Sequence, residues 1–454
     1  MGFPDKFIWG ASSAAYPIEG AYRDEGKGLS IWDMFAHKPG STWSGHNGDV
    51  AADHYHLYKE DVMMMKEMGL KAYRFSISWS RVIPQGRGNL NPAGVAFYDK
   101  LVDQLLEAGV DPVVTLFHWD LPNELYKKTG FVSTDAPRWF AEYVSQMVLK
   151  LGDRVRIWIT INDPQRFVVF GHQLGSMAPG ERLPFQQALI VAHELLQAHG
   201  RAVQAIRAGS KVDCKVGAAV MGIVYVPESD LPQDVEAARQ VMFRIQERSL
   251  WNNVWWLEPM TTGRYPMDGA RLFESMMPVV RPSELEAIYQ PLDFLGLNIY
   301  TASRVRIGED NRPQLIQNSL NTPVTAAGWA VMPSALYWGA KFFYEQYKLP
   351  IVITENGIAC TDWPVHDGKV HDAQRIDFLA KHLAQLERAI QAGVDVRGYF
   401  HWSFIDGVEW SDGTKYRYGL IYNNFETQKR LWKDSAYWYR DLIAANGAGL
   451  SAYG

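Results

Sequence analysis

Apolar positions along the 454-residue chain follow two alternating periods. Short runs rich in β-branched and aromatic residues are followed by longer segments with the helical period, many of which end at Gly. The short runs predict strands over residues 7–16, 71–78, 111–119, 156–161, 214–226, 293–300, 351–357 and 396–404. The longer segments predict helices, most clearly over residues 53–69, 91–109, 135–152, 185–209 and 373–393.

Strands that alternate with helices indicate a parallel sheet, and eight of them can close a (β/α)8 barrel. A doubly wound open sheet is the main alternative, and it usually has a glycine-rich phosphate loop after its first strand. The segment WGASSAAYPIEG does not have that G-x-G-x-x-G pattern. We therefore predict an α/β fold, a single (β/α)8 TIM-barrel domain over residues 1–454, with its active site at the C-terminal ends of the strands.

Two segments are longer than simple connections. Residues 227–277 have a helical, Trp-rich pattern, and residues 306–328 have the composition of a loop insertion after the sixth strand. Loops that follow strands build the active site of a barrel, so we expect both segments to lie over its upper end.

Charge and apolar content exclude several classes of protein. The formal net charge is -5 and there is no basic run, which disfavours a nucleic-acid partner. No run reaches the roughly 18 apolar residues of a membrane helix, so we expect no membrane partner. The segment MGFPDKFIWGASS lacks the pattern of a signal peptide, and we predict a cytoplasmic protein. Self-association into a homo-oligomer stays open.

Cysteine and histidine spacing does not indicate a metal site. Cys214 and Cys360 are far apart in the chain and form no metal-spaced pair. HELLQAH begins at His193, but a zincin helix would need its second His at the position of Gln197. We predict neither a metal nor a cofactor.

Two carboxylates carry the candidate chemistry. Asp163 follows the fourth predicted strand and Glu355 ends the seventh, so on a ring of eight strands they face each other across the barrel mouth. One acid that protonates a leaving oxygen and one carboxylate that attacks are the needs of glycoside hydrolysis. Aromatic residues make up 13% of the chain, with 17 Trp, which suits stacking on sugar faces. The other candidate residues at the strand ends are Arg74, His118, Trp119, Asn162, Asn298, Tyr300, Trp402, Glu409 and Trp410.

Six segments together resemble glycoside hydrolase family 1, the β-glucosidase family. In chain order they are FIWGASSAAYPIEGA, YRFSISWSRVIPQG, TLFHWDLP, DFLGLNIY, ITENG and HWSFIDGVEWSDG. Any one of them is weak evidence, whereas all six in the family's order, over nearly the whole chain, are highly specific. The resemblance implies a retaining β-glycosidase, an exo-hydrolase (EC 3.2.1.-) that cleaves terminal β-linked sugars by double displacement. Its substrate would be a small-molecule glycoside or oligosaccharide.

The resemblance also implies roles for individual residues. Glu355 of ITENG is the nucleophile, and Arg74 and Tyr300 orient it and hold it ionised. Asn162 contacts the 2-hydroxyl of the sugar, and Trp329 lines the aglycone entrance. The remaining residues of the implied sugar pocket are His118, Trp402, Glu409, Trp410 and Tyr418.

Four positions depart from the family pattern. The motif Asn-Glu-Pro reads Asn-Asp-Pro here, so Asp163 stands one methylene short where the acid/base Glu belongs. Gln165 replaces an aglycone-side Trp, and His401 stands where an apolar residue is common. Pro17 stands where a Gln would hold the 3- and 4-hydroxyls, and Pro has no side-chain donor. We predict that Asp163 is the acid/base and that the substrate specificity diverges from plain glucose.

Other interpretations stay open. An Asp before Pro at a strand end is typical of a turn, and without a working acid the chain would be a catalytically impaired sugar-binding barrel. An inverting or transglycosylating enzyme is a third reading. Retaining carboxyl pairs are about 5–5.5 Å apart and inverting pairs roughly 6.5–9.5 Å. The shorter side chain removes about 1.5 Å of reach and moves the pair toward the inverting range.

Overall fold

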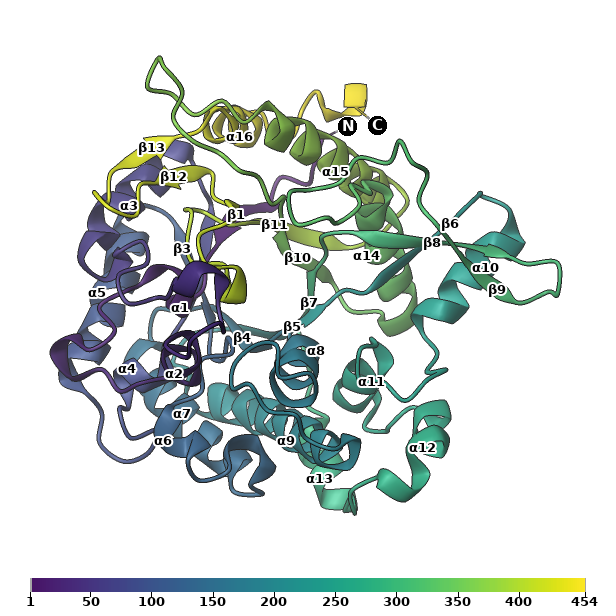
Figure 1. Ribbon diagram of the computed structural model, residues 1–454, viewed down its shortest axis with the longest axis horizontal. Helices are drawn as coiled ribbons and strands as arrows, with labels where there is room; N and C mark the ends of the chain where they lie inside the picture. Colours follow the sequence, from purple (N-terminus) through teal and green to yellow (C-terminus); the bar gives the residue numbers. More distant parts are fainter. Residues whose placement is uncertain (1, 454) are drawn as a thin grey trace.

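Eight parallel strands form a closed barrel in the computed structural model, which describes residues 2–453 (Figure 1). Around the barrel the order is β1-β11-β10-β7-β5-β4-β3-β2, and β2 pairs with β1. The strands are β1 (Ile8–Ser12), β2 (Ala72–Ser76), β3 (Asp111–Thr115), β4 (Ile157–Asn162), β5 (Lys215–Met221), β7 (Phe294–Asn298), β10 (Ile351–Asn356) and β11 (Val396–Trp402). The predicted (β/α)8 barrel is confirmed.

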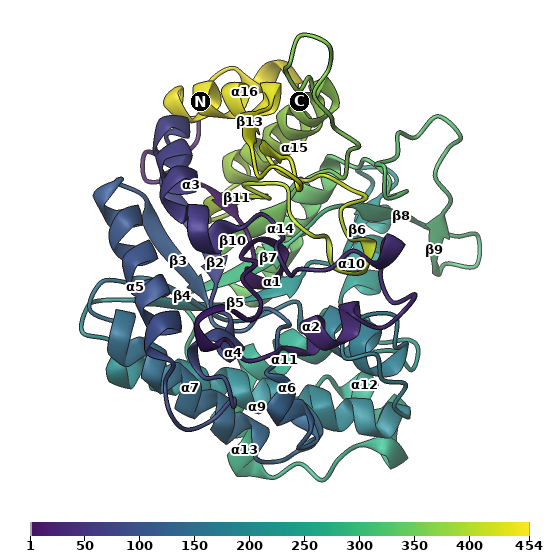
Figure 2. The same cartoon turned by 60° about the vertical axis from the view of Figure 1, so that its left-hand side comes forward.

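Long helices pack around the barrel (Figures 1 and 2). They are α3 (His54–Met68), α5 (Pro92–Glu107), α7 (Ala136–Leu151), α9 (Phe185–Gly209), α14 (Ser334–Tyr347), α15 (Ala373–Gln391) and α16 (Asp434–Ala444). The five helices predicted from the sequence begin and end within two residues of α3, α5, α7, α9 and α15. Local signals explain this agreement. Pro92 opens α5, where a missing N–H costs nothing, and Gly69 ends α3 in the left-handed region at φ 74°.

Shorter helices occupy the connections. They are α1 (Ala15–Ile18), α2 (Ile31–Ala36), α4 (Trp79–Val82), α6 (Asn123–Tyr126), α8 (Pro164–Val168), α10 (Pro232–Met242), α11 (Val254–Thr262), α12 (Met267–Phe273) and α13 (Pro282–Ile288). None of the helices within residues 2–453 has the length and apolar character that a membrane crossing requires.

The prediction of one strand over residues 214–226 is wrong. The chain leaves the barrel after β5, and β6 (Val224–Pro227) joins a second sheet with β8 (Ala302–Ile307) and β9 (Pro313–Ile316). Both strands contain buried apolar residues, so the apolar run does not mark the break between them. The loop insertion predicted over residues 306–328 contains the end of β8 and all of β9. The second sheet lies with α10 at one flank of the barrel (Figures 1 and 2). A hairpin of β12 (Ile421–Asn423) and β13 (Arg430–Trp432) completes the strands.

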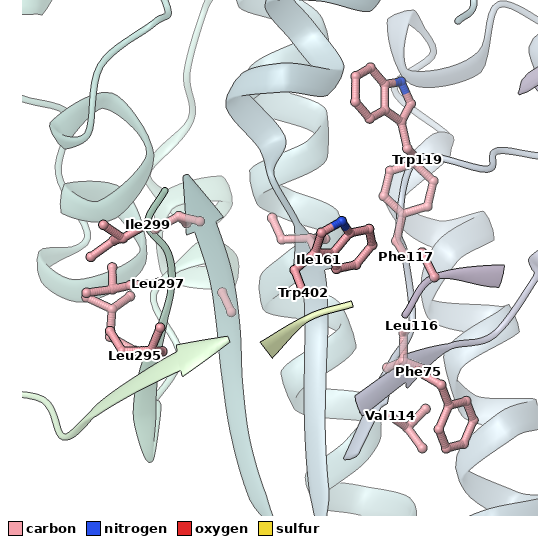
Figure 3. Packing of buried hydrophobic residues seen from close by; sticks show 14 of the residues in the cluster. Phe75, Val114, Leu116, Phe117, Trp119, Ile161, Leu295, Leu297, Ile299 and Trp402 are labelled. Atoms are coloured by element: carbon pink, nitrogen blue, oxygen red, sulfur yellow. The ribbon is translucent and has the colours of Figure 1, made fainter. Parts of the chain in front are cut away.

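Side chains along each barrel strand point alternately toward the helices and toward the barrel interior, so one face packs the core and the other supplies the site. On β7, Leu295 and Leu297 belong to the large apolar cluster between strands and helices, and Ile299 continues this face (Figure 3). Asn298 lies between them on the opposite face, because successive side chains of a strand point to opposite sides. The face that carries Asn298 supplies polar groups to the barrel mouth.

Large side chains fill the barrel interior below the mouth. Phe294 and Phe400 belong to a separate buried cluster formed by barrel strands. A Cβ atom at Gly217 would lie 2.5 Å from the Phe294 ring, and one at Gly10 would lie 2.5 Å from the Phe400 ring. Glycine at these two strand positions thus makes room for the two rings.

Candidate active site

A pocket opens at the C-terminal ends of the barrel strands. It contains about 530 Å³ of space, solvent at its mouth included. Its walls are His118, Trp119, Asp163, Arg166, Met177, Tyr300, Trp329, Glu355, Trp402, Glu409, Trp410, Asp412 and Tyr418. The two carboxylates predicted to face each other therefore lie in the same pocket.

Glu355 lies near the end of β10, where the pairing of β10 with β7 shifts between Ile353 and Glu355. Such an irregularity re-aims the side chain of a strand residue. Arg74 Nη1 donates to Oε1 of Glu355 at 2.7 Å, and the Tyr300 hydroxyl donates to Oε2 at 2.7 Å. Glu355 is buried, and each of its carboxylate oxygens accepts one of these bonds. Two hydrogen bonds of this kind fix the orientation of the carboxyl group.

The guanidinium of Arg74 is held by several strands at once. Its Nε donates to Thr115 at 3.1 Å, and its Nη1 also donates to the carbonyl of Thr354 at 3.0 Å. Its Nη2 donates to Oδ1 of Asn162. Arg74 is 1% exposed and lies behind the pocket wall, where it contacts Glu355 rather than open space.

Asp163 follows β4 directly and precedes helix α8. Its backbone is left-handed at φ 43° and ψ 55°, a conformation that Asp tolerates better than most residues. Its side chain makes no capping hydrogen bond to the helix and is free to serve the pocket. Its Oδ1 instead accepts a bond from Nδ2 of Asn298 at 2.8 Å.

The environment of Asp163 favours its protonated form. Burial raises the pKa of the Asp163 carboxyl, the negative charge of Glu355 raises it further, and the result is about 7. Arg166, Asn298 and Arg74 lower the pKa without cancelling that rise. The Asp163 carboxyl, beside the Glu355 carboxylate, can thus donate a proton at neutral pH.

Asn162 and Asn298 form a polar layer behind the pocket wall. Asn298 Nδ2 donates to Oδ1 of Asn162 at 3.0 Å, and Thr354 donates to Oδ1 of Asn298 at 2.6 Å. Nδ2 of Asn162 lies 2.9 Å from Nε2 of His118. Burial first, then Arg74, hold the pKa of His118 well below its usual range, so this imidazole is neutral and Nε2 can accept.

Aromatic rings form the walls of the pocket. The His118 ring stacks on Trp410 with centroids 5.5 Å apart, and Trp119 lies 5.2 Å from Trp410. Nε1 of Trp119 donates to the carbonyl of Ala178 at 2.8 Å, so this indole offers a face rather than a donor. The other rings at the pocket are Tyr300, Trp329, Trp402 and Tyr418.

Glu409 is a third carboxyl of the pocket. It lies in the segment after β11 and is buried. Burial is the main cause that raises its pKa to about 8. A protonated carboxyl can both donate and accept hydrogen bonds, as the binding of sugar hydroxyls requires.

The four residues expected to depart from the family pattern lie in different surroundings. Asp163 faces the pocket, but Gln165 does not: its Nε2 donates to the carbonyl of Met221 at 3.1 Å, and its Oε1 accepts from the Met221 N–H at 3.2 Å. His401 lies behind the wall, with Nε2 3.1 Å from the carbonyl of Tyr418. Pro17 is buried and its carbonyl accepts from the Val408 N–H. The Gln165 amide thus pairs with the backbone of β5.

Three residues of the pocket were missed in the sequence. Arg166 lies one helical turn after Asp163, and Asp412 lies one turn after Glu409. Spacing by three residues from a candidate could have indicated both. Met177 comes from the connection between β4 and α9, which the sequence pattern did not mark.

Comparison with known proteins identifies the family of this barrel. Residues 1–448 match the sequence model of glycosyl hydrolase family 1.

The chain belongs to glycosyl hydrolase family 1.

This membership makes the protein a glycoside hydrolase. The chain is 40% identical over 446 residues to β-glucosidase A of Thermotoga maritima, covering 98% of each protein. It is 42% identical to β-glucosidase A of Acetivibrio thermocellus, covering 98% of this chain and 99% of that protein. It also superposes on a solved structure of β-glucosidase from Thermotoga maritima in complex with castanospermine, with a TM-score of 0.90 over 98% of this chain and 99% of that chain.

Proposed function

We propose that this glycoside hydrolase is a retaining β-glycosidase with β-glucosidase-like exo activity, in which Glu355 is the nucleophile and Asp163 the acid/base. The relatives named as β-glucosidases support the substrate class. The observation that carries the assignment of roles is the geometry of Glu355. Arg74 and Tyr300 occupy its two oxygens, while Asp163 shares the pocket and receives only an amide bond.

The first step forms a glycosyl-enzyme ester. An oxygen of the Glu355 carboxylate attacks the anomeric carbon as the bond to the leaving oxygen breaks. The Asp163 carboxyl gives its proton to that leaving oxygen, and the aglycone departs as an alcohol. A pKa of about 7 leaves a large part of Asp163 protonated at neutral pH, as this role requires.

The second step releases the sugar. Glycosylation neutralises Glu355, and this removes one of the two effects that raise the pKa of Asp163. Asp163, now a carboxylate, takes a proton from water while the water oxygen attacks the anomeric carbon. The ester bond breaks, Glu355 leaves as a carboxylate, and two inversions at one carbon give net retention.

The pocket walls hold the sugar during both steps. Trp402 and Trp410 offer faces for apolar ring surfaces, and Glu409 and His118 offer hydrogen bonds to hydroxyls. We propose that Trp329 lines the aglycone side. Asn162 and Asn298 would act from behind this wall, where Asn298 holds Asp163 and Asn162 holds His118.

The short side chain of Asp163 is the basis of two alternative functions, an inverting or transglycosylating enzyme and a sugar-binding barrel. A carboxyl one methylene shorter than Glu reaches less far toward the leaving oxygen, and a wider gap between the two carboxyls is the geometry of an inverting enzyme. An acid that does not reach at all would leave a catalytically impaired sugar-binding barrel. The ion pair between Arg74 and Glu355 favours catalysis, since binding alone does not need an ionised nucleophile.

A screen of aryl glycosides tests the proposal. Wild-type protein is incubated with 4-nitrophenyl glycosides of several sugars in both anomeric forms, and the first-formed product is read by proton NMR. We expect hydrolysis of β-glycosides with the β-anomer formed first. An α-anomer formed first from a β-glycoside indicates an inverting enzyme, and no release from any glycoside supports the binding barrel.

We also propose a single domain over residues 1–454, a small glycoside or oligosaccharide as ligand, and a cytoplasmic location. The closed barrel with its surrounding helices supports the first of these. Self-association is best tested by light scattering of the purified chain.

A further inference from the structure

Arg166 is a pocket residue whose guanidinium has no partner among residues 2–453. It forms no ion pair and no side-chain hydrogen bond in this described range, and its Nε is buried without an acceptor. Its contact with the Phe170 ring is loose, with Cζ 5.9 Å from the ring centroid. Arg74 is the opposite case, because its guanidinium donates to Glu355, Asn162 and two threonines.

The position of Arg166 places its charge among the carboxyls of the pocket. It lies on α8, one turn after Asp163, and both residues face the same space. Its charge acts on Asp163, Glu409 and Asp412, and it lowers the pKa of each. None of these carboxyls comes within 4.0 Å to form an ion pair with it in the described structure. Arg166 is therefore near several carboxyls and bound to none of them.

An arginine in this state has unused binding capacity. Burying part of a charged group without a partner costs free energy, which an incoming anion would offset. The guanidinium is a planar fork of donors that matches carboxylate, sulfate and phosphate oxygens in pairs. The neighbouring Asp163 and Glu409 carry pKa values of about 7 and about 8, so at neutral pH they are partly protonated and compete weakly for it.

We propose that Arg166 is a specificity residue that binds an anionic group, a carboxylate, sulfate or phosphate, on the glycoside substrate. This inference rests on the proposed function and adds the charge of the substrate to it. Arg166 is not needed to bind the neutral part of the sugar, because Glu409, His118 and the tryptophans of the pocket wall are available for that role.

The anion can lie on either half of the substrate, the leaving group or the sugar. Asp163 protonates the leaving oxygen, so a group beside it can belong to the leaving-group half of the substrate. Glu409 is proposed to hydrogen-bond sugar hydroxyls, so a group beside it can be borne on the sugar half of the substrate. The shared chemistry is the anion, and the substrates of the test distinguish its source.

The test uses matched pairs of neutral and anionic substrates. For the sugar half, 4-nitrophenyl β-glucoside is compared with 4-nitrophenyl β-glucuronide and with its 6-phosphate and 6-sulfate. For the leaving-group half, the β-glucoside of 4-carboxy-2-nitrophenol is compared with its methyl ester. The proteins are wild type, Arg166→Gln, Arg166→Lys, and the control Arg201→Gln. Arg201 is exposed on outer helix α9, and Arg201→Gln changes the net charge of the protein by the same amount as Arg166→Gln.

We expect one anionic member to exceed its neutral partner in kcat/KM. Arg166→Gln should lower kcat/KM for that anion by about 10- to 100-fold, since a hydrogen bond to a charged group is worth about 1.5–3 kcal/mol. Most of the loss should appear in KM. The loss for the neutral partner should be several-fold smaller, Arg166→Lys should keep part of the preference, and Arg201→Gln should match wild type.

Binding separates this inference from the proposed function. Calorimetry with the matched thioglycosides, which resist hydrolysis, measures anion preference even where no turnover occurs. Tighter binding of an anionic thioglycoside that is lost in Arg166→Gln supports the inference with or without catalysis. Turnover of neutral glycosides with every anionic partner rejected, or equal losses for both partners in Arg166→Gln, overturns the inference and leaves the proposed function standing.

Discussion

Asn298 donates a hydrogen bond from Nδ2 to Oδ1 of Asp163 at 2.8 Å. Asn298 ends β7 and Asp163 follows β4, so this bond spans the barrel mouth across the intervening strand β5. Thr354, beside Glu355 on β10, fixes the amide in turn by donating to its Oδ1 at 2.6 Å. The acid/base candidate is thus held by the strand that lies next to the strand of the nucleophile candidate.

Replacing Glu355 by Gln should abolish turnover while the fold is kept. An amide is a far weaker nucleophile than a carboxylate, and loss of a nucleophile costs roughly 10⁴–10⁶-fold in kcat. The rate of 4-nitrophenol release measures this loss, with exposed Glu142→Gln as the matched control. Wild-type protein treated with a 2-fluoro sugar should carry the label on Glu355. Label on another carboxylate would contradict the assignment.

Replacing Asp163 by Ala should slow substrates according to their leaving groups. General acid catalysis is worth roughly 10²–10⁴-fold, and alkyl glycosides and disaccharides should lose about that much. Activated aryl glycosides should lose far less in the glycosylation step, because their leaving oxygen needs little protonation. Added azide should restore turnover and yield a β-glycosyl azide. Asp163→Glu, which keeps the carboxyl and lengthens the side chain by one methylene, is the control, and unchanged rates on disaccharides in Asp163→Ala would place the acid elsewhere.

The pH dependence of kcat/KM should follow the pKa of Asp163. The general acid must be protonated, and its pKa is about 7, so kcat/KM should be retained below about pH 7 and fall above it. Arg166 lowers this pKa, so Arg166→Gln should move the basic limb to higher pH. The profile is measured with a glycoside that has a poor leaving group. A basic limb near the ordinary pKa of an aspartic acid, about 3.9, would show that burial and Glu355 do not act on Asp163 as described.

Replacing Tyr300 by Phe should weaken catalysis without abolishing it. The change removes one of two hydrogen bonds to Glu355, at 2.7 Å, and leaves that of Arg74. A hydrogen bond to a charged group is worth about 1.5–3 kcal/mol, so kcat/KM should fall by about 10- to 100-fold. Steady-state kinetics measure the fall, and circular dichroism checks the fold. A change under twofold would mean that Tyr300 does not orient the nucleophile.

Substrate tolerance should be broad at the 3- and 4-hydroxyls. Pro17 is buried, its carbonyl is bound to the Val408 N–H, and it offers no side-chain donor. A site that does not hydrogen-bond a hydroxyl rejects its epimers weakly. We expect gluco, galacto and fuco glycosides with the same aglycone and charge to differ by less than about 100-fold in kcat/KM. A larger preference for glucose would show that other groups replace the missing amide.

Local patterns in the sequence were enough to predict much of the fold. The helices α3 and α9 were predicted within one residue of their ends, because apolar period and end signals act within a few residues. The same locality explains the error at residues 214–226, where an apolar run continues while the chain passes from β5 to a second sheet. The ends of the apolar runs placed Asp163 and Glu355 at strand ends, and the count of eight strands placed them across the barrel mouth from each other.

The sequence by itself therefore determined the barrel, its family and the carboxylates at its mouth, because strand order and the ends of strands are properties of the chain. Only the tertiary structure decided which neighbours face the pocket. Gln165 and Arg166 are adjacent in the sequence, yet the Gln165 amide binds the backbone of β5 and Arg166 enters the pocket. The physical reason is that the direction of a side chain depends on partners from distant strands. Those partners exist only once the barrel has closed.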